Sequence, residues 1–535
     1  HQYILGRAGL AAAITIRTVN DTHSLITDSS WRCTDECGFM PDTIRINPGQ
    51  GYSELYDARI EPRRWTPVHV IGEVGMAPWG TPVRSILPAA TFEPVSAVRI
   101  VDAHEVRTTG RSYHVDLHEI FIGEIVEPEF FYLVTTIRAR REMDCTVTFP
   151  YSRLWCIFGE FMINGRLYAS EMNTYEHVPV GDGPRSYAVH LDEGDNLFAM
   201  RLDNIAMGMH VGLHVACEPH ESECVSPCNE EAAFCGVTSL LNDDSNTVNI
   251  EPGEWINHPT NPAVPDDVKR QAAAECWASL KRGDVASVRE WVRPLNPRAV
   301  SENHPQYAIM TQHNSRPIPL DRNTESLILD NSDACVLDTP GDQSFVLDFG
   351  REVFGYICFD IDRAAAGETI DISGFEYRDW YGAIQEMDGV NNGFRYITRE
   401  GRQHFVSYVC RGFRYVNVTV RHAHPVVIRH VGMYHSTYPV TRIGEFHSSD
   451  DTLNRIFEIS ERTTRLCMQD TFIDCPGHEQ SFWIGDFRNE ALIAHYLYHA
   501  DAIVENCHRV GLGAMATNPL PTSSLPSEPQ GIMPT

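Results

Sequence analysis

The sequence predicts a multidomain protein in which antiparallel β-sandwich and jelly-roll domains are followed by α-helices. Up to about residue 440, short runs of β-branched and aromatic residues alternate with Gly, Pro, Asn and Asp, as antiparallel sandwiches require. The character changes at Ser448-Ser-Asp-Asp, after which apolar residues recur at helical spacing. A chain of 535 residues also exceeds what one hydrophobic core organises, so several domains are expected.

Two β-rich units are expected in the first part of the chain. Residues 1–110 are predicted to form an N-terminal β-sandwich, with strands such as Ile14-Thr-Ile-Arg-Thr-Val. Residues 111–225 are predicted to form a jelly-roll of carbohydrate-binding type. Its strands and turns include Phe131-Tyr-Leu-Val-Thr-Thr-Ile-Arg and Glu193-Gly-Asp-Asn.

Residues 226–310 interrupt this pattern. The stretch from Asp266 to Arg293 carries Ala, Glu, Lys and Arg at helix-like spacing after Pro265. We therefore expect a connector or insertion that is partly helical. Residues 311–440 return to strand-like runs and are predicted to form a further β-sandwich.

After residue 440 the pattern predicts two amphipathic helices separated by a loop. Ser449 and Asp450 are both suited to cap the first helix. A Pro- and Gly-rich segment at Asp474 ends it, and the second helix is expected from Asn489 to His499. The residues that mark the two helix faces are Leu453, Ile456, Phe457 and Leu466, and then Leu492, Tyr496 and His499.

The loop between these helices carries the strongest chemical signal. The segment Asp474-Cys-Pro-Gly-His-Glu479-Gln-Ser-Phe-Trp483-Ile-Gly-Asp486 places three carboxylates and a Trp within thirteen residues. A Trp among acids suits a sugar-binding cleft, because a pyranose has an apolar face to stack and hydroxyls to hydrogen-bond. Acid-catalysed cleavage of a glycosidic bond also needs a carboxylic acid to protonate the departing oxygen. The spacing alone leaves a structural loop with a solvated acidic rim as an equal alternative.

This segment resembles the signature of the α-L-rhamnosidases of glycoside hydrolase family 78, in which Asp-Cys-Pro precedes a Glu and a Trp-x-Gly-Asp. The resemblance implies that Glu479 is the general acid and that Asp474 and Asp486 hold the rhamnose hydroxyls. It also implies that Trp483 lines the sugar pocket. At Gly477-His-Glu-Gln the chain lacks a residue and some charge that many relatives carry, so it resembles the shorter-loop branch and its subsite preferences could differ.

Two more segments support the resemblance. Phe345-Val-Leu-Asp-Phe-Gly-Arg-Glu-Val-Phe-Gly-Tyr and Arg411-Gly-Phe-Arg-Tyr-Val-Asn-Val are similar to strands of the family's β-sandwich. By the same resemblance, residues 441–535 are the N-terminal part of an (α/α)6 six-hairpin catalytic barrel. Twelve helices need several hundred residues, so we expect this chain to be a fragment.

The resemblance implies an inverting exo-α-L-rhamnosidase that hydrolyses terminal α-L-rhamnose from glycosides or oligosaccharides. Inversion needs a second carboxylate as general base, which in the family comes from a later barrel loop and is expected beyond the end of this chain. Asp470 and Glu490 are interpreted as charges at helix ends or behind the site. The alternatives are another inverting six-hairpin glycosidase of different sugar specificity, or a carbohydrate-binding protein without hydrolysis.

Composition narrows the partners. The formal net charge of −29 repels nucleic acid and anionic membrane surfaces. The sequence contains no run of about eighteen apolar residues, which a membrane-spanning helix would need. A neutral rhamnose-containing glycoside or oligosaccharide is compatible with this charge. No cofactor is expected. The oligomeric state stays open.

Cysteine usage bears on compartment and metal binding. The fifteen cysteines are scattered, mostly in apolar strands, which favours buried free thiols and a cytoplasmic protein, with secretion as the alternative. One cluster could bind zinc, but its spacings are wider than the usual Cys-x2-Cys. Reduced thiols or a disulfide are therefore preferred and no metal is expected. The cluster comprises Cys217, Cys224, Cys228 and Cys235.

Overall fold

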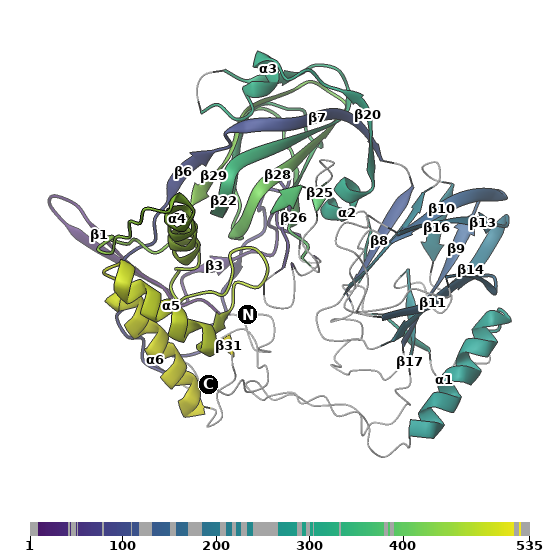
Figure 1. Cartoon of the computed structure of the whole chain (residues 1–535), viewed down its shortest axis with the longest axis horizontal. Coiled ribbons are helices and arrows are strands. Elements are labelled where there is room, and N and C mark those ends of the chain that lie inside the picture. Colours follow the sequence, from purple (N-terminus) through teal and green to yellow (C-terminus); the bar gives the residue numbers. More distant parts are fainter. Residues whose placement is uncertain are drawn as a thin grey trace.

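The structure is a computed structural model of the 535-residue chain. It describes residues 9–40, 43, 46, 50, 52–76, 80–108, 110–116, 131–149, 157–169, 185–203, 210–216, 221–225, 233–238, 266–285, 292–295, 300–302, 304–330, 333–378, 384–385, 390–517 and 524–525. The described part is a mostly β-sheet, multidomain protein with helices at its C-terminal end (Figure 1). None of its helices is long and apolar enough to span a bilayer.

An assembly of eleven strands forms the upper part of Figure 1. Strand β22 is its longest element and pairs antiparallel with β7, β27, β28 and β29. Successive residues of β22 from Gln343 to Phe349 are all buried. Both faces of the strand are therefore covered, because successive side chains of a strand point to opposite faces. The strands are β4 (Leu55–Asp57), β6 (Glu93–Ser96), β7 (Arg99–Thr108), β20 (Gln312–Pro317), β21 (Cys335–Leu337), β22 (Gly341–Arg363), β23 (Thr369–Phe375), β26 (Gly393–Ile397), β27 (Gln403–Val406), β28 (Arg411–His422) and β29 (Val426–His435).

A separate sandwich over residues 1–110 would pair its strands with one another. Three strands of this segment pair instead with strands of the 311–440 region. Strand β7 pairs with β22, β6 pairs with β29, and β4 pairs in parallel with β26. The core of the assembly accordingly mixes Ile100 and Ala103 with residues of the 311–440 region. Strands from distant segments share one sheet because that buries their common apolar face. The expected domain limits themselves stay predictions.

A second β-unit lies at the right of Figure 1 and consists of two sheets. One has the order β13-β10-β15-β8-β19; the other has the order β12-β11-β14-β9-β17-β18, with β16 also paired to β9. Their facing sides form one apolar core around Leu133, Phe161 and Val215. The strands are β8 (Arg111–Asp116), β9 (Phe131–Ala139), β10 (Met143–Phe149), β11 (Ile157–Ile163), β12 (Arg166–Ala169), β13 (Arg185–Leu191), β14 (Gly194–Asp203), β15 (His210–Ala216), β16 (Ser222–Val225), β17 (Cys235–Thr238), β18 (Val292–Pro294) and β19 (Val300–Glu302).

The helix expected in the connector is present but shorter. Helix α1 spans Asp266–Lys281, and a left-handed Gly283 follows it, as is common after a helix end. Cys276, Trp277 and Leu280 pack against the outer face of the second sheet. The helix therefore covers that sheet.

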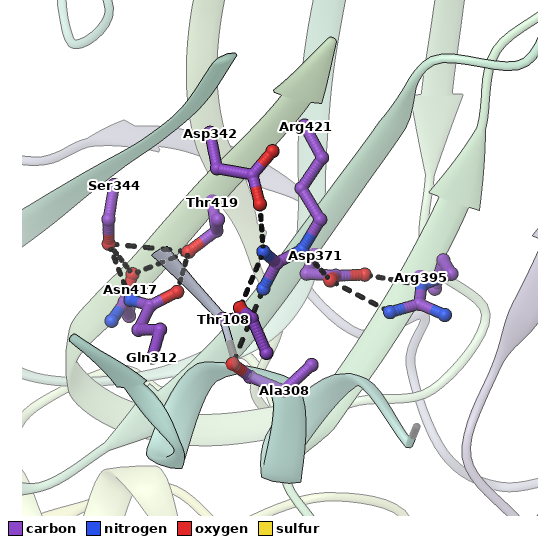
Figure 2. A network of polar contacts seen from close by, with 10 residues as sticks. All are labelled: Thr108, Ala308, Gln312, Asp342, Ser344, Asp371, Arg395, Asn417, Thr419 and Arg421. Carbon is purple, nitrogen blue, oxygen red and sulfur yellow. Dashed lines mark hydrogen bonds and ion pairs between the residues drawn. The ribbon is translucent and has the colours of Figure 1, made fainter. Parts of the chain in front are cut away.

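A buried polar network ties the first β-assembly to the segment that returns from the second unit (Figure 2). Asp371 receives Arg395 Nε at 2.6 Å and Arg421 Nε at 3.0 Å. Burial by itself raises the pKa of Asp371, but the two guanidinium groups outweigh it and hold the pKa below its usual range. Arg421 also donates to the carbonyl of Ala308 in helix α2 (Pro305–Met310). Because Asp371 holds Arg421 in place, the bond from Arg421 to Ala308 helps fix where the chain re-enters the assembly.

Helices follow the last long strand, as the sequence predicts. Helix α4 spans Asp451–Leu466, α5 spans Ile484–Leu497 and α6 spans Asp501–Thr517. Asp450 caps α4 by accepting a hydrogen bond from the Thr452 amide at 2.8 Å. The second helix begins at Ile484, earlier than Asn489, because Ile484, Gly485 and Asp486 already have helical geometry, whereas Trp483 is extended. Figure 1 shows the three helices on the left, with α4 above α5 and α6.

The predicted stripes pack only in part. Leu466 is buried, and Phe457 packs against the core that the helices share. The shared core contains Phe472, Phe487, Ala494 and Leu497. Several residues of the predicted stripes are instead exposed in the described part of the chain, including Leu453, Ile456, Leu492 and Tyr496.

The remaining elements are short. They are β1 (Ala13–Arg17), β2 (Thr22–Ile26), β3 (Arg32–Cys33), β5 (Thr66–Pro67), α3 (Arg322–Glu325), β24 (Tyr377–Arg378), β25 (Ile384–Gln385), β30 (Phe482–Trp483) and β31 (Ser524–Leu525).

Candidate active site

The acidic motif forms the loop between α4 and α5 and the first turns of α5. Asp474 and Ser481 close this loop through two hydrogen bonds. The Asp474 amide donates to the Ser481 carbonyl at 3.0 Å, and the Ser481 amide donates to Asp474 Oδ1 at 2.8 Å. The chain therefore turns back on itself, and the residues between them, including Glu479, stand at the tip.

Cys475 supports the loop from within. Burial, together with the neighbouring Asp474 carboxylate, raises the pKa of the Cys475 thiol to about 12, so the thiol keeps its proton. It donates to Asp474 Oδ2 at 3.0 Å, and its sulfur accepts from the Glu479 amide at 3.2 Å. The Cys of the Asp-Cys-Pro sequence thus connects the first acid of the motif to the second.

Glu479 and Trp483 are in direct contact. The Trp483 indole N–H donates to Glu479 Oε2 at 2.8 Å. On the other side, His478 Nδ1 lies 3.9 Å from Glu479 Oε1. The Glu479 side chain is 36% exposed, so its carboxyl group is held by neighbours and still open to a ligand.

Asp486 lies in the first turn of α5 and is exposed. One helical turn later, Glu490 lies near both Asp486 and Asp474. Burial and these two carboxylates raise the pKa of Glu490 to about 8. The structure therefore gathers the two predicted hydroxyl-binding acids around Glu490. Of the two interpretations given for Glu490, a helix-end charge does not fit, because α5 begins at Ile484 and Glu490 lies in its interior. A charge behind the site stays a prediction.

Asp470 has a local role. Its carboxylate accepts from the Thr471 amide at 3.0 Å, and its carbonyl accepts from Asn506 Nδ2 at 2.8 Å. These bonds stabilise the turn that follows α4 and connect it to α6, in keeping with a helix-end charge.

The loop rests on the β-assembly. A side-chain carbon at Gly412 of β28 would lie 2.4 Å from the carbonyl carbon of Pro476, so only glycine allows this approach. Gln480 donates to the Cys410 carbonyl at 3.0 Å, and Gln50 donates to the Gly477 carbonyl at 2.8 Å. Sequence reasoning missed Gln50 because a lone glutamine carries no pattern.

Two further carboxyl groups belong to the β-assembly, and one of them, Glu376, lies near His478 of the loop. Removal from water raises the pKa of Glu376, and the charge of His478 lowers it in part. Burial and the neighbouring Glu376 raise the pKa of Glu352 to about 8. Both acids were missed, since they lie in strand-like sequence far from the motif.

Two of the four cysteines in the predicted cluster, Cys224 and Cys235, lie among the described residues. In the described ranges, no group of three or more His, Cys, Asp or Glu residues is placed to hold a metal ion. Cys224 is a buried free thiol whose pKa burial raises to about 12, and Cys235 is disulfide-bonded. Cys217 and Cys228 lie outside the described residues.

Three family models match the chain. Residues 441–535 match the bacterial alpha-L-rhamnosidase six-hairpin glycosidase domain. Residues 130–298 match alpha-L-rhamnosidase domain D2, and residues 338–434 match the bacterial alpha-L-rhamnosidase concanavalin-like domain. A comparison with curated protein sequences found no match.

Solved structures extend the comparison. The GH78 family rhamnosidase of Bacillus sp. GL1 is 28% identical, with a TM-score of 0.80, and the match covers 98% of this chain and 54% of that one. The chain therefore spans about half the length of the Bacillus protein. A rhamnosidase from Klebsiella oxytoca is 18% identical over 40% of this chain and 43% of that one, with a TM-score of 0.33. This second similarity is too weak to carry an argument.

Proposed function

We propose that this chain, which belongs to the bacterial α-L-rhamnosidases of glycoside hydrolase family 78, forms part of an inverting exo-α-L-rhamnosidase. The observation that carries the proposal is the Glu479–Trp483 contact, which lies on one short loop together with Asp474 and precedes Asp486 on α5. The proposed substrate is a neutral glycoside or oligosaccharide with a terminal α-L-rhamnose. Cytoplasmic location stays a prediction.

Glu479 is the proposed general acid. Its carboxyl group is partly exposed at the tip of the loop and can reach the glycosidic oxygen of a bound sugar. The indole N–H of Trp483 donates to Oε2, so the proton to be transferred is proposed to lie on Oε1. Protonation of the departing oxygen lowers the barrier most for substrates whose leaving group is a poor one.

Asp474 and Asp486 are the proposed ligands of the rhamnose hydroxyls. Carboxylates accept short, charge-assisted hydrogen bonds from hydroxyl groups. Each Asp474 oxygen already accepts one hydrogen bond from the loop, which fixes its orientation while leaving lone pairs for a sugar. The exposed Asp486 side chain is free to turn toward a ligand.

A general base for inversion must be an ionised carboxylate on the far side of the sugar. Glu490 lies near Asp474 and Asp486, but its pKa of about 8 keeps it protonated at neutral pH. A protonated carboxyl group is a poor base. We therefore assign no base among the described residues and expect it from a later loop of the barrel.

The decisive experiment is Glu479→Gln in an active enzyme that contains this chain. Activity on poorly activated rhamnosides should fall by roughly 10²- to 10⁴-fold, whereas aryl rhamnosides with good leaving groups should lose much less. An equal loss on both substrate types would argue that Glu479 serves binding. A panel of aryl glycosides of other sugars, tested on the wild type, separates rhamnosidase activity from another six-hairpin specificity.

A further inference from the structure

The carbonyl groups that precede Glu479 are held by a residue from the other end of the chain. Gln50 Nε2 donates to the Gly477 carbonyl at 2.8 Å and to the His478 carbonyl at 3.0 Å. Gln50 is buried, with 6% of its surface exposed, and it lies 427 positions before Gly477. Both amide protons of one side chain are thus directed at two successive peptide groups of the loop.

The other side of Glu479 is held in a comparable way. Gln480 has a backbone φ of +56°, a left-handed conformation that residues other than glycine rarely adopt. Its amide donates to the Cys410 carbonyl at 3.0 Å and to the Pro476 carbonyl at 2.9 Å. These two bonds oppose the backbone preference of Gln480 for other conformations, and they bind the loop to the β-assembly.

The orientation of the two carbonyl groups decides where Glu479 is presented. Rotation of the Gly477–His478 or His478–Glu479 peptide plane changes the backbone dihedrals next to Glu479, and hence the direction of its side chain. Gln50 opposes both rotations, because each would withdraw a carbonyl oxygen from a buried donor and leave that donor unsatisfied. Trp483 holds only the end of the Glu479 side chain and cannot set the backbone.

We propose that Gln50 is a positioning residue for Glu479, whose buried side-chain amide sets the direction of the general acid by holding the Gly477 and His478 carbonyls. A residue of the N-terminal segment therefore takes part in preparing the catalytic loop. The inference rests on the proposed function for the role of Glu479 as an acid. The hydrogen bonds by which Gln50 holds the loop do not depend on that role of Glu479.

The test compares Gln50→Glu and Gln50→Met with a matched control, Gln403→Glu. Gln403 is equally buried, at 4% exposure, and its amide donates to the Arg399 and Gly401 carbonyls at 2.8 and 2.9 Å, within the β-assembly. Glu keeps the shape but loses the donor, and Met keeps the volume without the charge. If Gln50→Glu does not fold, Gln50→Met still removes the donor.

Two measurements are made on each variant. Hydrogen–deuterium exchange of the Ser481 and Glu479 amides in the 535-residue chain reports on the loop directly. Kinetics in the active enzyme compare a poorly activated rhamnoside with an aryl rhamnoside. A misdirected acid should lower kcat/KM for the first by roughly 10- to 100-fold and for the second by much less. Exchange of both amides should become faster.

The control separates positioning from general destabilisation. Gln403→Glu should leave both the ratio of the two kcat/KM values and the exchange of the loop amides unchanged. An unchanged ratio in the Gln50 variants, or the same change in Gln403→Glu, would overturn the proposal. If the wild type hydrolyses no rhamnoside, the proposed function fails, and the exchange data alone still decide whether Gln50 holds the loop.

Discussion

The indole N–H of Trp483 donates a 2.8 Å hydrogen bond to Oε2 of Glu479. Trp483 is therefore more than an aromatic surface for a sugar, because its polar edge contacts the carboxyl group that we propose as the acid. The bond joins the residue just before α5 to the tip of the preceding loop. It provides the first way to separate sugar binding from proton transfer.

Trp483→Phe should separate these two roles. Phe keeps an aromatic face but cannot donate to Glu479, and a hydrogen bond to a charged group is worth about 1.5–3 kcal/mol. We expect kcat/KM for poorly activated rhamnosides to fall about tenfold or more, while calorimetry shows little change in affinity for free L-rhamnose. A loss of affinity as large as the loss of rate would assign Trp483 to sugar binding alone.

Asp474→Asn and Asp486→Asn should each weaken the binding of free L-rhamnose. Each change replaces a charge-assisted hydrogen bond by a neutral one, so we expect about 1.5–3 kcal/mol per variant at most. Isothermal titration calorimetry measures the effect. Asp470→Asn is the control, because Asp470 is exposed at the turn after α4 and its carboxylate accepts from the Thr471 amide of the same turn. Unchanged affinity in both variants would remove these acids from the pocket.

Glu490 should make stability depend on pH. Burial and its two acidic neighbours raise the pKa of Glu490 from 4.5 to about 8, so the folded protein keeps the proton where the unfolded chain releases it. The contribution to stability is complete below about pH 4.5 and is lost as the pH rises to about 8. Glu490→Gln should thus gain stability relative to the wild type between pH 5 and pH 9. Urea unfolding at pH 5 and at pH 9 measures the free energy of unfolding of both proteins. The same difference between Glu490→Gln and the wild type at the two pH values would contradict the prediction.

Gly412→Ala should displace the loop. The added carbon would lie 2.4 Å from the backbone of Pro476, and backbone cannot move aside as a flexible side chain can. We expect a loss of about 1–3 kcal/mol in the free energy of unfolding and reduced activity on rhamnosides. Gly511→Ala is the control, since nothing lies within 4 Å of its added carbon. A Gly412→Ala variant as stable and active as Gly511→Ala would contradict the close contact.

Local patterns in the sequence were sufficient to predict that strands come first along the chain and helices follow. Short β-branched and aromatic runs broken by Gly, Pro, Asn and Asp predicted strands before residue 440, and Asp450 with helical spacing predicted α4. The acidic motif also placed Glu479 and Trp483 close together, because they lie four residues apart in a short loop. Each of these predictions depends on residues that are neighbours in the chain.

Contacts between distant segments could not be predicted in this way. Only the tertiary structure brings Gln50 to the Gly477 carbonyl and places β7 beside β22. Likewise, only helix packing decides that Leu453 stays exposed while Phe487 is buried in the described structure. The physical reason is that a single glutamine, or one apolar face among several, has no periodicity. Its partner is chosen by the burial of surfaces that come together only when the whole chain folds.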